Sequence, residues 1–229
     1  HWADHDWDVW QAVEARTGIY TEPESKTVHG LWIGDTLSPL ELLTINSFID
    51  KGHEFKLWLY DEMKTQLPPR VLIGDANEII PSEKIFRYKN ISQFGHGKGS
   101  VAGFSDIFRY KLLYEHGGWW VDMDITCLKK FDIDKSYFFR KHHNLNVVGN
   151  VMKCPKGSLL MKCCYEDAIA EIDEHNTDWH KPINILNKHI EALQLNNYIV
   201  KECSNQDRWD DTGRFIYGNE EYPDHWYFI

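Results

Sequence analysis

Two aspartates separated by one residue offer the clearest chemistry in this chain. Asp122 and Asp124 lie in an otherwise apolar stretch that follows Gly117-Gly118. Alternate side chains of a strand share a face, so both carboxylates would project together, about 6–7 Å apart. Two acids at the end of a buried strand repel each other and lose solvation, and a hard cation relieves both costs. Because oxygen-only ligands suit Mg²⁺ or Mn²⁺, the pair predicts a metal site.

A second pair of ionisable residues precedes the glycines. Asp106 and Arg109 are three residues apart and share one face of a helix predicted over about 105–116, with Ser105 as its cap. Beside the acidic strand, this face would complete a pocket with two acids, a cation site and a guanidinium. Such a pocket suits a sugar on a diphosphate, because carboxylates accept sugar hydroxyls while arginine and metal neutralise phosphates. The alternative is an ion pair on the helix surface, which would contribute little.

The elements that would position these residues begin with a strand, a helix and a second strand. Residues 28–33 form a short apolar run, Ser38-Pro39-Leu40-Glu41 carries the signals of a helix start, and residues 55–60 alternate like a strand. This order predicts a parallel sheet with right-handed crossovers. Further strands are predicted at 119–126 and 147–152, and further helices at 158–172 and 182–193.

Composition narrows the class of protein. The formal net charge is −10 and no basic stripe offsets it, which argues against nucleic acid as a partner. The five cysteines are odd in number and form no C-x-x-C pair, so a disulfide framework or a structural zinc site is disfavoured. No apolar run approaches the length of about 18 residues that a transmembrane helix needs, and no signal peptide is visible. A cytoplasmic location is therefore expected.

Two blocks of the sequence carry a family resemblance. Residues 104–124, together with Val28-His29-Gly30-Leu31-Trp32-Ile33-Gly34, resemble the sugar-binding-region glycosyltransferases that contain a D-x-D motif. This is glycosyltransferase family 32, which includes capsular polysaccharide and yeast mannosyltransferase relatives, and the blocks also resemble the catalytic core of clostridial glucosylating toxins. The resemblance implies a GT-A fold, with a Rossmann-like, mainly parallel sheet flanked by helices. It implies a single domain over residues 28–229, preceded by an N-terminal extension over residues 1–27.

The resemblance also implies roles for particular residues. Trp32 stacks on the nucleotide base, and Asp122-Met123-Asp124 is the D-x-D motif that binds Mn²⁺ or Mg²⁺. The residues implied to bind the donor are Trp32, Ile33, Gly34, Asp106 and Arg109. Those implied to act in catalysis are Asp106, Arg109, Asp122 and Asp124. This chain departs from the usual pattern at Trp119-Trp120, where one smaller aromatic is more common, so the identity of the sugar stays open.

The implied reaction is transfer of a hexose, with retention at the anomeric carbon, from a nucleotide-diphosphate sugar. The resemblance favours UDP as the nucleotide. The acceptor is expected to be a glycan or a lipid-linked saccharide of polysaccharide biosynthesis. A lipid-linked acceptor would bring the protein to the inner face of the membrane as a peripheral partner.

A third metal ligand is expected from the C-terminal region. Related retaining enzymes often complete the metal site with a histidine or another polar residue there, and Asp224-His225-Trp226 is the only such group in this chain. We hypothesise that His225 reaches the metal or the diphosphate and that Trp226 helps to close a lid over the donor. The alternative is a surface histidine near a fraying end.

Two other functions compete with sugar transfer. Residues 122–126 also fit the D-x-D-x-T motif of haloacid-dehalogenase-type phosphatases, in which Asp122 would be the phosphorylated nucleophile and Asp210-Asp211 the later acidic pair. That motif usually lies near the start of its domain, whereas here a strand–helix–strand unit precedes it. The second alternative is a module that binds a sugar-nucleotide or glycan without turnover.

Overall fold

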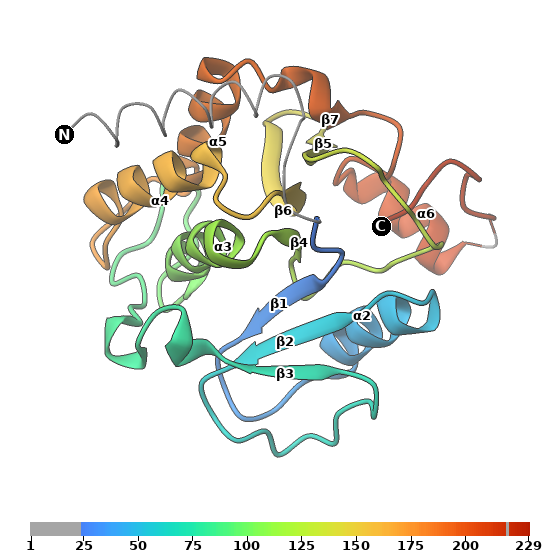
Figure 1. The fold of residues 1–229 in the computed structure, drawn as a ribbon, viewed down its shortest axis with the longest axis horizontal. Coiled ribbons are helices and arrows are strands. Elements are labelled where there is room, and N and C mark those ends of the chain that lie inside the picture. Colours follow the sequence, from blue (N-terminus) through green and yellow to red (C-terminus); the bar gives the residue numbers. More distant parts are fainter. Residues whose placement is uncertain (1–23, 219) are drawn as a thin grey trace.

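The computed structural model describes residues 24–218 and 220–229 (Figure 1). The predicted N-terminal extension over residues 1–27 therefore lies outside the described residues, except for residues 24–27.

A seven-stranded sheet forms the centre of the molecule, with the order β3-β2-β1-β4-β6-β5-β7. The pairs β1–β2, β1–β4, β2–β3 and β5–β7 are parallel, and only β4–β6 and β5–β6 are antiparallel. The predicted fold class, a mainly parallel α/β sheet flanked by helices, is confirmed. The strands are β1 (Val28–Trp32), β2 (Phe55–Leu59), β3 (Leu72–Asp75), β4 (Gly118–Val121), β5 (Phe138–His142), β6 (Asn146–Cys154) and β7 (Ile199–Val200).

The predicted strand–helix–strand unit is present as β1, α2 (Pro39–Asp50) and the parallel strand β2. Helix α2 begins where the capping box placed it. Ser38 Oγ accepts the N–H of Leu40 at 3.2 Å, and Glu41 Oε2 accepts the N–H of Ser38 at 2.6 Å. These bonds satisfy donors that the first turn of a helix leaves unpaired.

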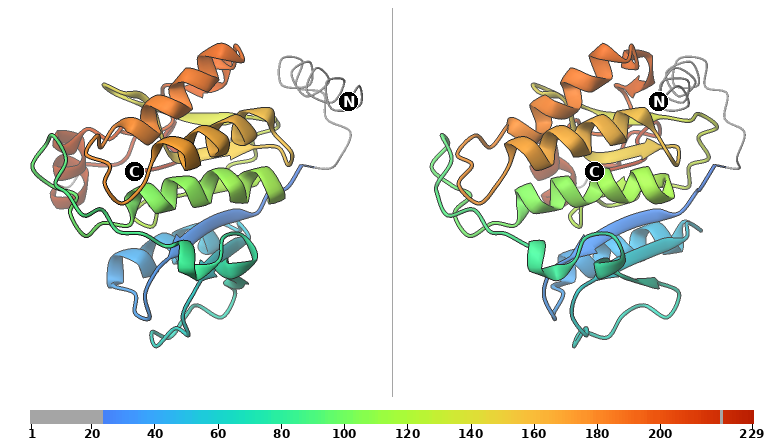
Figure 2. Two further views of the ribbon diagram at one scale, coloured as in Figure 1. Left: turned by 90° about the vertical axis from the view of Figure 1, so that its left-hand side faces the viewer. Right: turned by 60° about the vertical axis from the view of Figure 1, so that its left-hand side comes forward.

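Helices cover both faces of the sheet. Helices α3 (Ala102–His116), α4 (Leu159–Glu171) and α5 (Lys181–Ala192) stack together over one face, and α2 covers the other (Figure 2). Strand β4 shows the resulting alternation, because Trp120 joins the core under α3 while Trp119 and Val121 join the core under α2. The remaining helical elements are α6 (Trp209–Tyr217) and the 3₁₀ turns η1 (Ala76–Glu78), η2 (Ser82–Lys84) and η3 (Asn196–Tyr198).

Two predicted boundaries are wrong. Helix α3 starts at Ala102, whose N–H is accepted by Ser100 Oγ at 3.0 Å, so Ser105 lies inside the helix and is not its cap. Strand β4 ends at Val121, five residues before the predicted end at residue 126, because the chain turns at the acidic motif. No helix within the described ranges combines the length and the apolar character needed to span a bilayer.

Gly118, the first residue of β4, is expected to tolerate no side chain. Its φ is +91°, and an added Cβ would lie 2.7 Å from the carbonyl oxygen of Thr27. We predict that Gly118→Ala lowers the free energy of unfolding by about 1–3 kcal/mol, the usual cost of such backbone strain. Urea unfolding followed by circular dichroism measures this.

Gly213 provides the matched control, because an added Cβ there meets nothing within 4 Å and the residue lies within α6. Gly213→Ala is expected to stabilise the fold by about 0.5–1 kcal/mol, since alanine is the better helix former. Equal effects of the two substitutions would contradict the description of the turn before β4.

Candidate active site

A pocket of about 510 Å³ opens at the carboxyl ends of β1 and β4. Parallel α/β sheets commonly bind ligands outside the carboxyl ends of their strands. The end of β1, the start of α2, one face of α3 and the segment after β4 all contribute to this pocket. Its lining includes Trp32, Ile33, Glu41, Ser105, Asp106, Arg109, Trp120, Asp122, Met123 and Asp124.

The acidic motif forms a turn rather than the end of a strand. The N–H of Asp122 donates to the carbonyl oxygen of Asn150 on β6 at 2.9 Å, and the N–H of Ile125 then donates back to the carbonyl oxygen of Asp122 at 3.2 Å. The prediction that Asp122 and Asp124 alternate on one face of a strand is therefore wrong in its geometry. Both nevertheless line the same pocket, while Met123 between them is buried in the core under α2.

Asp106 and Arg109 form a buried ion pair on the pocket-facing side of α3. Their side chains are only 12% and 7% exposed, which excludes the alternative of a solvated pair on the helix surface. Arg109 Nη1 also donates to the carbonyl oxygen of Gly149 at 2.5 Å and lies 3.5 Å from Asp122 Oδ1. Trp120 Nε1 donates to that same Asp122 oxygen at 2.8 Å. The orientation of Asp122 is thus fixed by an indole and a guanidinium.

Among the residues that the structure describes, Asp124 has no ion-pair partner comparable to Arg109. Loss of solvation and, to a smaller extent, the negative charge of Asp122 raise the pKa of its carboxyl from 3.8 to about 6. The charge of Asp207 contributes in the same direction, whereas Arg140 opposes it. A carboxylate with this pKa is one whose ionised form a bound cation would stabilise.

Two buried side-chain polar atoms of residues that contact Asp122 lack a hydrogen-bond partner, and they are the only such side-chain atoms in the described part of the chain. They are Arg109 Nε and Asn150 Oδ1. Buried polar groups are normally paired, so unpaired atoms of this kind are typical of sites built for a ligand. Together with two carboxylates, this donor set fits a hard divalent cation with its phosphate ligand.

Comparison with known proteins agrees with this chemistry. Residues 42–139, which include Asp106, Arg109 and both acids of the turn, match the family described as "Glycosyltransferase sugar-binding region containing DXD motif". Residues 42–139 are thus similar to the sugar-binding region of DXD glycosyltransferases. The resemblance predicted from the sequence is therefore confirmed over these residues.

Solved structures share the fold of this chain. A structure titled "PaToxG Glycosyltransferase" superposes with a TM-score of 0.55 at 14% identity, covering 83% of this chain and 76% of the other. A transferase with two cysteine-to-serine substitutions gives a TM-score of 0.46 at 12% identity, covering 91% and 94%. At these identities the likeness concerns the fold alone. No curated protein sequence matches the chain.

The structure does not bring the predicted C-terminal residues into the pocket. His225 is exposed, and Trp226 is 8% exposed with its ring centroid 5.0 Å from that of Phe215 on α6. The N–H of Leu128 donates to the carbonyl oxygen of Tyr227, which holds this segment beside the chain that leaves the acidic turn. Within the described residues, no cluster of three or more His, Cys, Asp or Glu is arranged to hold a metal. The expectation that His225 completes the site and that Trp226 covers it thus finds no support in this arrangement.

Gly34 is not among the lining residues of the pocket, but it lies next to Trp32, the predicted base platform. An added Cβ at Gly34 would lie 3.6 Å from Trp32 Nε1, which itself donates to the carbonyl oxygen of Thr36 at 2.8 Å. The loop after β1 therefore fixes the plane of the indole. The phosphatase alternative requires Asp210 and Asp211 beside Asp122. They lie in the first turn of α6 and are not among the residues that line the pocket.

Sequence reasoning missed two residues that contact the acidic turn. One is Trp120, which lies two residues before Asp122 and donates a hydrogen bond to its carboxylate. Asn150 carried no signal at all, because its contact with Asp122 follows from the antiparallel register of β4 and β6. Such a register is set by tertiary packing and not by any local motif.

The pKa of Asp124 predicts an unusual stability effect in metal-free protein. The folded-state pKa of about 6 exceeds the ordinary value of 3.8, so the folded protein binds this proton more tightly than the unfolded chain. The destabilisation is therefore absent below pH 3.8, grows as the pH rises, and is complete above about 6. We predict that Asp124→Asn raises the melting temperature in EDTA at pH 7.5, and that the gain shrinks towards pH 4.

Asp75→Asn is the control of opposite sign. Hydrogen bonds from the main chain and side chain of Asn77 lower the pKa of Asp75, so its ionised form contributes stability that is present above its unfolded pKa and lost as the pH falls. Removing that charge is expected to lower the melting temperature at pH 7.5. A loss of stability in Asp124→Asn under these conditions would contradict the proposed repulsion in the acidic turn.

Proposed function

We propose that this protein is a metal-dependent, retaining hexosyltransferase that uses a UDP-sugar donor and a glycan or lipid-linked saccharide acceptor. The observation that carries the proposal is the single pocket shared by the acidic turn, the buried Asp106–Arg109 pair and Trp32. We propose further that residues 28–229 form one GT-A catalytic domain. We propose a cytoplasmic location for the protein, with peripheral association at the inner face of the membrane through the acceptor lipid.

Each side chain of the pocket has a proposed role. Asp122 and Asp124 would hold Mn²⁺ or Mg²⁺, which when bound neutralises the diphosphate. Arg109, already desolvated, would stabilise the negative charge that develops on the departing nucleoside diphosphate. Asp106, held in place by Arg109, would accept hydroxyls of the donor sugar. Trp32 would stack on the base, with Ile33 and Gly34 beside the nucleotide.

Retention follows from the family resemblance, and none of the pocket residues is proposed as a covalent nucleophile. Attack by the acceptor hydroxyl on the face from which the diphosphate departs would account for it. The configuration of the anomeric proton in the product, observed by NMR as it forms, tests this proposal. Inversion, or a trapped covalent sugar–enzyme adduct, would overturn it.

Donor and metal should bind together. We predict that UDP-sugars raise the melting temperature in Mn²⁺ but not in EDTA, because a ligand at 100 times its Kd adds about 2.7 kcal/mol to stability. Asp122→Asn and Asp124→Asn should each abolish this shift.

Asp211→Asn on α6 is the control for these two variants and should respond like the unaltered protein. Tight donor binding with no transfer or hydrolysis would favour the non-catalytic alternative. Hydrolysis of a phosphomonoester without any effect of sugar-nucleotides would instead favour the phosphatase.

Trp32 should determine affinity for the base. We predict that Trp32→Ala weakens UDP binding by ten-fold or more, because a base–aromatic stack typically contributes about 1–3 kcal/mol. Trp32→Phe should lose less affinity, because it keeps an aromatic ring. Isothermal titration calorimetry in Mn²⁺ measures both. Trp209→Ala is the matched control, because that indole is 85% exposed on α6 and should leave UDP affinity unchanged. Equal losses in the two alanine variants would contradict the base platform.

A further inference from the structure

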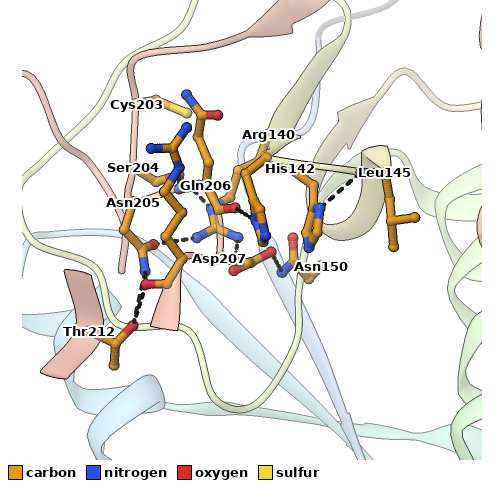
Figure 3. Close-up of polar contacts among 12 residues, drawn as sticks. Arg140, His142, Leu145, Asn150, Cys203, Ser204, Asn205, Gln206, Asp207 and Thr212 are labelled. Carbon is orange, nitrogen blue, oxygen red and sulfur yellow. Dashed lines mark hydrogen bonds and ion pairs between the residues drawn. The ribbon is translucent and has the colours of Figure 1, made fainter. Parts of the chain in front are cut away.

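A fully buried cation lies close to the acidic turn without being part of the pocket lining. Arg140 on β5 is 1% exposed. Its Nε donates to Ser204 Oγ at 2.8 Å, its Nη2 donates to Asn205 Oδ1 at 2.8 Å, and its Nη1 forms an ion pair with Asp207 (Figure 3). One guanidinium therefore holds three residues of the segment that leads into α6.

The backbone of this segment adopts a conformation that side chains rarely take. Gln206 and Asp207 have φ values of +53° and +60°, so two consecutive residues other than glycine are left-handed. The carbonyl oxygen of Gln206 is held in turn by the N–H of His143 at 3.0 Å. Conformations of this kind persist only where the surroundings enforce them, and they concentrate at functional sites.

The held carboxylate connects to the acidic turn through one residue. Asp207 Oδ2 accepts the side-chain N–H of Asn150 at 2.9 Å, and the main-chain carbonyl oxygen of Asn150 accepts the N–H of Asp122 at 2.9 Å. Figure 3 shows Asn150 and Arg140 on either side of Asp207. The main chain of Asp122 is thereby tied, through β6, to the buried arginine on β5.

Asp207 also sets the balance of charge around the turn. It is the one carboxylate that the described structure pairs with Arg140. Without the charge of Asp207, the buried guanidinium of Arg140 would be uncompensated. Its positive charge would then repel a metal ion bound near Asp124. A residue that orients a ligand-bearing segment and tunes its field can control metal affinity without touching the metal.

We propose that Asp207 is a positioning residue for the cation and donor site: it holds Asn150 against Asp122 and offsets the charge of Arg140. This inference rests on the proposed function, because it presumes that Asp122 and Asp124 bind a divalent cation.

Asp207→Asn is the decisive variant. Asparagine tolerates the left-handed backbone and leaves Arg140 an acceptor, so the substitution removes charge while keeping the shape of the segment. The Kd for Mn²⁺, measured on the full chain by electron paramagnetic resonance titration, is expected to rise ten- to a hundred-fold, the usual effect of losing an outer partner of a metal ligand. At saturating Mn²⁺, the fold loss in kcat of this variant should be smaller than its fold loss in Mn²⁺ affinity.

Asp167→Asn on α4 is the matched control. The side chain of Asp167 is 31% exposed, against 28% for Asp207, and it also has two partners, Lys188 and His189. This variant should bind Mn²⁺ like the unaltered protein, and urea unfolding of both variants in the same buffer separates affinity from stability.

A reciprocal exchange tests the contact itself. Asn150→Asp alone places two carboxylates against each other and should weaken Mn²⁺ binding. The double variant Asn150→Asp/Asp207→Asn restores an amide–carboxylate pair and should bind Mn²⁺ more tightly than either single variant. Absence of Mn²⁺ binding in the unaltered protein would overturn the proposed function and this inference with it. Normal Mn²⁺ affinity in Asp207→Asn, with or without a loss of stability, would overturn this inference alone.

Discussion

The structure of the site depends on one constraint: Asp122 and Asp124 lie close together, partly removed from water, and the residues around them do not neutralise both charges. Asp122 is restrained by an indole N–H and a nearby guanidinium, whereas the pKa of Asp124 is raised to about 6. Folding supplies enough apolar packing on both faces of the sheet to hold the two acids in this unfavourable arrangement. A site in which charge is left partly uncompensated is predisposed to take up a cation.

The change of strand direction within the sheet explains how the acids are presented. Strands β1, β2 and β4 run parallel and open a crevice at their carboxyl ends, but β6 returns antiparallel against β4. The carbonyl oxygen of Asn150 on β6 accepts the last N–H of this ladder, and the chain then turns into the crevice. The antiparallel neighbour therefore determines where β4 stops and where the carboxylates begin to face the donor pocket.

Local sequence signals were sufficient for much of this architecture. The capping box at Ser38 and Glu41 located α2, and strand alternation accounts for the division of the Trp119 and Trp120 side chains between two cores. The predicted strand end at residue 126 is wrong because apolar side chains continue to enter the core at Met123 and Ile125 after the hydrogen-bond ladder has ended. Their alternation therefore looks like strand where there is none. The short strands β3 and β7 carry too few residues for a period to be recognised.

Some residues of the candidate site could be predicted from local sequence spacing, and others could not. Asp106, Arg109 and the acidic turn lie within twenty residues of one another, so helical and strand spacing could bring them together. Asn150, Arg140 and Asp207 come from later parts of the chain, and their convergence depends on strand register and on a left-handed turn. No local pattern encodes that convergence, and the placement of His225 and Trp226 away from the pocket has the same origin.

The burial of Phe228 has a consequence for the order in which the molecule can assemble. This ring is fully enclosed and packs against Phe48, Trp119, Phe131 and Phe138, while its main chain bridges to Cys127 just beyond the acidic turn. During synthesis, the layer beneath α2 stays open until residue 228 has left the ribosome. The support under the acidic turn is thus completed only after all of its other aromatic residues have been synthesised, and a nascent chain lacking that ring would expose aromatic surface of a kind that chaperones bind.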